Sequence, residues 1–130
     1  MPSESWEQGQ VVKQLKCQGY LCASIPNEGR RTAVGLAEAK RRGLTTGAPD
    51  LLVFTPPPLK PWTRGVAIEF KKKKGGKEDP DQLAFLAALT AIGWETCLAH
   101  GAAEALDFLA KLGYAVATYG PSPSGAPQDA

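Results

Sequence analysis

The sequence predicts one α/β domain in which a mixed central β-sheet is flanked by helices. Its 130 residues are enough for one hydrophobic core and too few for two ordinary domains. Short apolar segments bounded by Gly and Pro alternate with longer segments whose apolar residues recur every three or four positions. Their order is helix, strand, helix, strand, strand, helix, strand and helix, which favours a sheet with helices packed against it.

The chain begins with an amphipathic helix and a short strand. Apolar residues recur at helical spacing over residues 4–18, Ser3 is a suitable N-cap, and Gly19 can end the helix. Residues 20–25 are apolar, and Pro26 follows them directly. We therefore expect a strand and then a turn.

A basic helix precedes the two central strands. Residues 33–42 are rich in helix formers, stop at Gly43 and carry three cations in the last turn, where the helix dipole favours positive charge. Residues 51–54 and 65–71 have the composition of strands, and the three prolines at 56–58 require a loop between them.

The last part of the chain repeats the alternation of helix and strand. The elements expected there are a helix from Asp79 to Gly93, a strand at 95–99 and a helix at 102–112. Residues 114–119 are apolar without a clear preference. We expect residues 1–119 to form the domain and residues 120–130, rich in Pro, Ser and Gly, to form a flexible tail.

The composition argues against several classes of protein. No apolar run approaches the roughly 20 residues that span a bilayer, and the N-terminus lacks the layout of a signal peptide, so we expect a cytoplasmic protein. Cys17, Cys22 and Cys97 form no CxxC pair, and His100 is the single histidine. We expect buried free thiols rather than disulfides or a zinc site. Carboxylates would then hold any metal, and such ligands favour Mg²⁺ or Mn²⁺.

Positive charge is concentrated in the middle of the chain. Residues 28–74 contain eleven Lys and Arg against four Asp and Glu, a local +7, whereas the rest contains four against nine, or −5. Such a block attracts polyanions, and it makes their binding sensitive to salt. A solvated charged surface is the alternative interpretation.

Three residues around the central strands have the chemistry of a hydrolytic site. Side chains alternate along a strand, so Glu69 and Lys71 share one face, which is either exposed or lines a cleft. A hairpin would bring Asp50, at the start of the adjacent strand, beside Glu69. Two carboxylates can share a divalent ion that activates water for phosphodiester hydrolysis, with the lysine offsetting negative charge. The alternative is a turn residue and an ordinary surface pair.

The residues around this triplet resemble the VRR-NUC domain, a family of the PD-(D/E)xK nuclease superfamily. The matching segments are Asn27-Glu28-Gly29-Arg30-Arg31, Gly43 to Leu51, Ile68-Glu69-Phe70-Lys71, Asp81 to Leu86 and Gly93-Trp94. The resemblance extends from about Glu4 to Leu109 and looks most like the small standalone members encoded by phages. It implies a restriction-endonuclease-like core, and the cytoplasm of the host cell if a phage encodes the chain.

The resemblance also implies roles for individual residues. Those that match catalytic positions of the family are Asp50, Glu69, Lys71, Gln82 and Glu4. Asp50, Glu69 and the backbone carbonyl of Phe70 would bind the metal. Glu4 fits the family's first-helix glutamate better than Glu7, although both are also ordinary first-turn acids that stabilise a helix dipole. Gln82 is otherwise a solvated residue at the start of a helix.

The cations of the basic block would bind DNA through its backbone. The residues expected to do so are Arg30, Arg31, Lys40, Arg41, Arg42, Lys72, Lys73 and Lys74. Phosphate contacts position DNA without reading its sequence. A hydrated surface that touches nothing is the alternative for any one of these residues.

The leading hypothesis is an endodeoxyribonuclease that depends on Mg²⁺ or Mn²⁺ and cuts branched DNA. The standalone members of the family resemble Holliday-junction resolvases, which act as homodimers because a four-way junction needs two symmetric cuts. One alternative is a nickase or flap-type nuclease that acts as a monomer. Another is a DNA-structure-binding module without catalysis.

Overall fold

A four-stranded mixed sheet forms the centre of the molecule. The computed structural model describes residues 3–26, 32–72 and 77–118. The strands lie in the order β1 (Cys22–Ser24), β2 (Leu51–Val53), β3 (Val66–Phe70) and β4 (Glu95–Ala99). The first three pair antiparallel, and β4 runs parallel to β3. The predicted mixed sheet in an α/β domain is therefore confirmed.

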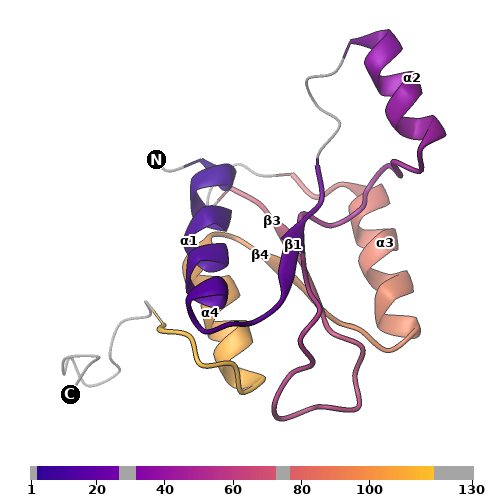
Figure 1. The fold of residues 1–130 in the computed structure, drawn as a ribbon. Helices are drawn as coiled ribbons and strands as arrows, with labels where there is room; N and C mark the ends of the chain where they lie inside the picture. The colour runs from indigo at the N-terminus through magenta and orange to yellow at the C-terminus, as the bar shows by residue number, and fades with distance from the viewer. Residues whose placement is uncertain (1–2, 27–31, 73–76, 119–130) are drawn as a thin grey trace.

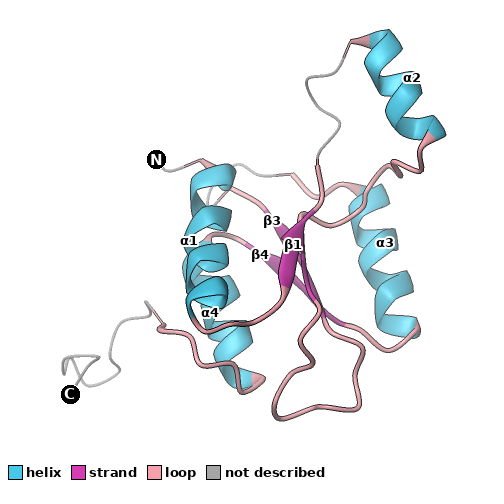
Figure 2. Cartoon of the chain, in the orientation of Figure 1, coloured by secondary structure: helices cyan, strands magenta, loops and turns pink. Residues whose placement is uncertain are grey.

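Helices cover both faces of this sheet (Figures 1 and 2). On one face α1 (Glu4–Cys17) packs beside α4 (Ala102–Lys111), and on the other lies α3 (Pro80–Ala91). Because parallel strands cannot be joined by a tight turn, α3 serves as the crossover from β3 to β4. The remaining helix, α2 (Ala33–Arg41), projects away from the body of the molecule (Figure 1).

The sequence marks the starts of α1 and α3 through their caps. The Trp6 N–H donates to the Ser3 hydroxyl at 3.0 Å, and the Asp81 N–H donates to the Asp79 carboxylate at 2.9 Å. Each cap satisfies a backbone donor that has no partner within its own helix. Both predicted N-caps are therefore confirmed, and they fix where the two helices begin.

Strand β3 is buried on both of its faces. Val66, Ile68 and Phe70 belong to the main core together with apolar residues of α1 and α4, and each is fully buried. Burial of a side chain of this size contributes about 1.5–3 kcal/mol. Ala67 is also fully buried, and Glu69 is only 3% exposed. The face that carries Glu69 is thus covered by α3 rather than open to solvent.

The structure corrects some expected boundaries. The first strand covers only Cys22–Ser24 instead of residues 20–25, and Cys17 is exposed rather than buried because it lies on the outer side of α1. Residues 114–118 have no regular structure but are anchored, because the buried Tyr114 donates its O–H to the Thr55 carbonyl. The expected tail, residues 120–130, lies outside the described residues.

The helices of the described ranges are too short or too polar to cross a membrane.

Candidate active site

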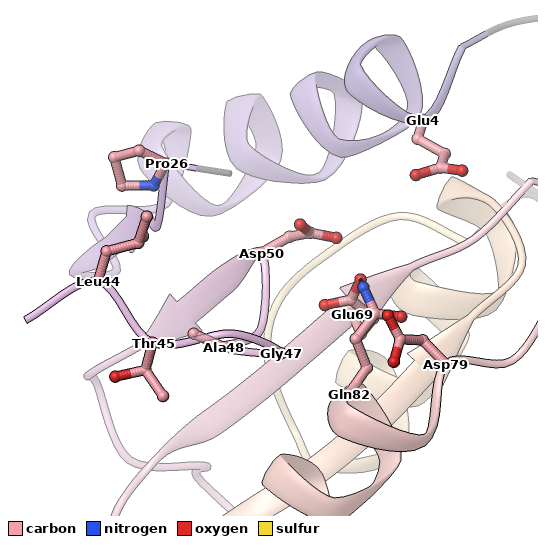
Figure 3. Close-up of a pocket in the computed structure, with 10 residues that line it drawn as sticks. All are labelled: Glu4, Pro26, Leu44, Thr45, Gly47, Ala48, Asp50, Glu69, Asp79 and Gln82. Atoms are coloured by element: carbon pink, nitrogen blue, oxygen red, sulfur yellow. Dashed lines mark hydrogen bonds between the residues drawn. The ribbon is translucent and has the colours of Figure 1, made fainter. Parts of the chain in front are cut away.

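A polar cavity lies where β2 begins and β3 ends. Its volume is about 220 Å³. The loop between α2 and β2 forms one wall through residues from Leu44 to Ala48, and the start of α3 forms another. The polar side chains that matter most here come from four different segments (Figure 3): Glu4, Asp50, Glu69, Asp79 and Gln82.

The antiparallel register of β2 and β3 brings Asp50 to Glu69. Leu51 pairs with Ile68, so the residue before Leu51 lies opposite the residue after Ile68. The Phe70 N–H donates to Asp50 Oδ2 at 2.9 Å, which fixes the direction of this carboxylate. The carboxyl groups of Asp50 and Glu69 are close enough to interact by a hydrogen bond when one holds a proton. The two acids that the sequence singled out therefore meet in one site.

Glu69 is held by the first turn of α3 but is not fully satisfied. Gln82 Nε2 donates to Glu69 Oε2 at 2.6 Å. Glu69 Oε1 and Gln82 Oε1 are both buried, and within the described residues neither meets a hydrogen-bond donor. A buried oxygen without a donor costs free energy, on the order of 1–3 kcal/mol. The site therefore contains acceptor oxygens that a proton or a cation would satisfy.

Burial changes the acidity of both carboxyls, and the charge of Asp50 adds to its effect on Glu69. Burial raises the pKa of Glu69, the charge of Asp50 raises it further, and the result is a pKa of about 8. Burial also raises the pKa of Asp50, although the hydrogen bond from the Phe70 N–H opposes this effect. Two carboxyls in one poorly solvated site resist simultaneous ionisation. A divalent cation would remove that conflict, since its charge neutralises both groups.

Lys71 and Glu4 contribute charges of opposite sign to this pair. The positive charge of Lys71 acts on both carboxyls and lowers the pKa of each. The Lys71 side chain is half-buried directly after β3. The negative charge of Glu4 raises the pKa of both carboxyls, so Glu4 also faces the pair. The predicted triplet thus lies within one electrostatic neighbourhood.

Glu4 and Glu7, the two acids in the first turn of α1, lie in different surroundings. Glu4 lines the cavity, whereas Glu7 is buried elsewhere and accepts a hydrogen bond of 3.4 Å from the Ala102 N–H at the start of α4. One turn after Glu4, Gln8 Nε2 donates to the Asp50 carbonyl at 3.3 Å. The first turns of α1 therefore face the site with Glu4 and hold the backbone of Asp50 with Gln8.

The profile of the VRR-NUC domain matches residues 3–103, which is most of the chain. This chain belongs to the VRR-NUC family. It is accordingly a nuclease-type domain, of the hydrolase class. Nucleases of this family are generally metal-dependent. No curated protein sequence matches the chain.

Two solved structures resemble this VRR-NUC domain. One, named "VRR_NUC domain protein", has 23% sequence identity and a TM-score of 0.67, over 86% of this chain and 91% of the other. The second, named "VRR_NUC domain", has 24% identity and a TM-score of 0.55, over 85% of this chain and 97% of the other. At these identities the similarity shows the fold.

The donor atoms of the VRR-NUC domain fit a hard divalent cation. Carboxylate oxygens are the ligands that Mg²⁺ and Mn²⁺ prefer, and Glu69 Oε1 is a buried oxygen without a donor. Asp50 and Glu69 are the residues that would hold the ion. A complete cage is not preformed by side chains, because no group of three or more His, Cys, Asp or Glu in the described ranges is arranged to hold a metal. Backbone oxygens, water and substrate would supply the other ligands.

The cations predicted to bind DNA are only partly described. Lys40, Arg41 and Arg42 are exposed at the end of α2, and Lys72 is exposed just beyond β3. The remaining four lie outside the described residues: Arg30, Arg31, Lys73 and Lys74.

Two residues of the site were missed in the sequence. Asp79 was recognised as the cap of α3, but it also lines the cavity. Gln8 had no assigned function, although it contacts the Asp50 backbone. The sequence contains one signal for Gln8. It lies one helical turn after Glu4 and therefore on the same side of α1.

Proposed function

We propose that this VRR-NUC domain is an endodeoxyribonuclease that uses Mg²⁺ or Mn²⁺ to hydrolyse phosphodiester bonds in branched DNA, as Holliday-junction resolvases do. The observation that carries the proposal is the meeting of the Asp50 and Glu69 carboxyls under the positive charge of Lys71. Buried acids with raised pKa values are typical of functional sites, and a divalent cation would favour the ionised forms of both carboxyls.

Asp50 and Glu69 are proposed to hold the ion, with the Phe70 carbonyl as a further ligand. When bound, such an ion lowers the pKa of a water molecule and stabilises charge on the phosphate. The Phe70 N–H keeps Asp50 Oδ2 in place, and Gln82 keeps Glu69 Oε2 in place, so each acid retains one oxygen for the cation. The hydrogen bond from Gln8 holds the backbone from which Asp50 extends.

Lys71 is proposed to act on the reacting groups without binding the metal. An ammonium group beside the two acids can orient the attacking water and offset the negative charge that develops on the phosphate. Glu4 faces the same carboxyls from α1, where it can accept a hydrogen bond from a water molecule in the cavity.

The cavity suits the backbone of a nucleic acid better than a whole nucleotide. Its volume of about 220 Å³ is below the roughly 300–1,000 Å³ of pockets that enclose small organic ligands. Its lining is mainly polar, and none of the described residues that form it is an aromatic on which a base could stack. This supports a phosphodiester group as the part of the substrate that enters.

A homodimer would place two such sites on one junction, and α3 supplies a surface for it. Only Leu86 of this largely apolar helix is buried. The aliphatic residues left exposed on α3 and just after it are Leu83, Ala84, Ala87, Ala88, Ala91 and Ile92. An apolar helix face of this kind is typical of a surface that packs against another protein.

The test compares cleavage of a four-way junction by the wild type, Asp50→Asn and Lys71→Met, with Mg²⁺ and with EDTA. We expect either substitution to lower the cleavage rate by at least about a hundredfold, because each removes a group that acts on the charge of the transition state. Asp107→Asn and Lys13→Met are matched controls on exposed positions of α4 and α1, and both should cleave normally. Thermal unfolding checks that all variants are folded.

Equal cleavage in EDTA, or full activity of Asp50→Asn, would overturn the proposal. A panel of junction, flap and nicked-duplex substrates, measured alongside the mass in solution, separates a dimeric resolvase from a monomeric nickase or flap nuclease. Salt-sensitive DNA binding that survives Asp50→Asn, without products under any metal, would instead indicate a binding module.

A further inference from the structure

Helix α2 has no partner among the described elements that explains its stability. None of its nine residues is buried, and no other described helix or strand packs closely against it (Figure 1). An isolated helix shorter than roughly 12–15 residues is marginal in water even when rich in alanine. The cap hydrogen bond from the Gly35 N–H to the Thr32 hydroxyl, 3.0 Å long, helps the first turn, but Gly35 itself weakens the helix.

The outer surface of α2 is suited to an anion rather than to an apolar partner. Val34 is 76% exposed, but Glu38 and Arg41 on the same side form an exposed ion pair of 2.7 Å. Lys40 and Arg42 are exposed beside them and form no ion pair within the described residues. A second copy of the chain would find its apolar contact on α3 instead.

The position of α2 connects these cations with the candidate active site. Arg42 follows the helix, and Leu44, two residues later, already lines the cavity. Two residues of extended chain span at most roughly 7 Å. A strand of DNA with one phosphodiester in the cavity would therefore carry neighbouring phosphates past the end of α2.

We infer that α2 is a DNA-docking arm whose helix is stabilised by the DNA backbone, with Lys40 and Arg42 as its phosphate contacts. The inference rests on the proposed function for the identity of the ligand. It adds that an element outside the catalytic cavity is ordered by the substrate, so that part of the binding free energy is used to complete the helix.

The test measures binding of the full chain to a fluorescent four-way junction in EDTA, where no cleavage occurs. Affinity falls as salt rises, so a plot of log affinity against log salt has a negative slope. In the double variant Lys40→Gln with Arg42→Gln, this slope should become less steep by about 1.8, which is about 0.9 for each lost phosphate contact. Lys13→Gln with Lys16→Gln removes the same charge from exposed positions of α1 and should leave the slope unchanged.

A second variant tests the helix without changing charge. Ala37 is exposed on α2, and Ala37→Gly should weaken binding by about fivefold, the factor that the difference in helix propensity gives, at an unchanged salt slope and melting temperature. Amide hydrogen exchange over residues 36–42 should be fast in the free protein and slow when DNA is added.

The docking arm is overturned if Ala37→Gly binds DNA as the wild type does, or if these amides are already protected without DNA. Loss of a dimer in Ala37→Gly, measured by solution mass, would also overturn it, because α2 would then contact a second copy. If the arm behaves as expected while wild-type protein cuts nothing with any metal, the nuclease proposal fails and the docking arm stands.

Discussion

Among the described acids that line the cavity, Glu69 is the one that is buried. It is 3% exposed, it shares its surroundings with Asp50, and its pKa is raised to about 8. Burial is the larger cause and the neighbouring carboxyl the next. Successive side chains of a strand point to opposite faces of the sheet. Because Phe70 points into the core, Glu69 must point towards α3, where it is buried.

The raised pKa predicts how stability depends on pH when no metal is present. Folded Glu69 keeps its proton up to about pH 8, whereas an unfolded glutamate loses it near 4.5. The stabilising effect is therefore complete below about 4.5 and is lost as the pH rises through about 8. Glu69→Gln cannot ionise, so in urea unfolding at about pH 9 in EDTA we expect it to exceed the wild type by a few kcal/mol.

Two comparisons support the interpretation of that experiment. Below about pH 4.5 the wild type and Glu69→Gln should be equally stable, because the wild-type carboxyl is then protonated in both the folded and the unfolded state. Glu78→Gln, at an exposed position, should follow the wild type at every pH. A Glu69→Gln protein that is less stable than the wild type at high pH would show that Glu69 bears no such electrostatic cost.

At the residue level, Asp50 and Glu69 could be predicted from the sequence more reliably than the residue of α1 that faces them. Asp50 and Glu69 follow from strand pairing, because an antiparallel hairpin places the start of one strand beside the end of the other. The choice between Glu4 and Glu7 depends on how α1 is rotated against the sheet. Packing of Val11 and Leu15 in the core sets that rotation, and it involves residues far apart in the sequence.

Between the elements, Gly47 controls how the loop before Asp50 meets α3. Its φ of +88° lies in the region that favours glycine, and a Cβ there would lie 2.5 Å from the Asp81 carbonyl oxygen. Backbone atoms cannot move aside as a flexible side chain can. The close approach of this loop to α3 thus defines one side of the cavity.

Gly47→Ala should therefore damage both stability and activity. We expect a loss of roughly 2 kcal/mol in urea unfolding, from the strained φ and the clash together, with a lower cleavage rate because the loop carries Asp50. Gly19→Ala is a close control, since Gly19 has a φ of +80° but open space where the Cβ would lie. It should lose only about 1 kcal/mol and cleave normally. Equal effects of the two substitutions would exclude the clash as the cause.

Most elements could be predicted from the sequence because their ends are marked. Ser3 and Asp79 cap helices, and the helix stops are followed by glycines with positive φ such as Gly19 and Gly93. The short extent of β1 could not be predicted, because it depends on how much of β2 is available for pairing. Nor could the isolation of α2, since an alanine-rich segment gives no indication of whether another element packs on it.

For the whole molecule, the exposed apolar face of α3 leads to a prediction about assembly. If it forms the proposed homodimer, Ala87→Glu should convert the protein to a monomer without unfolding it, because the interface would have to bury an unpaired charge. Solution mass and thermal unfolding measure the two effects. Ala117→Glu adds the same charge at an exposed position away from α3 and should keep the dimer. A wild-type protein that is monomeric at high concentration would contradict this assembly.

The burial of β3 on both faces has a consequence for the durability of the candidate site. This strand is paired along both edges, with β2 and β4, and Glu69 is its second-last residue. Backbone in such a position opens only when the entire domain opens. Partial fraying of segments that do not line the cavity would therefore leave Glu69 in place, and its contribution to catalysis should disappear only with the last cooperative loss of structure.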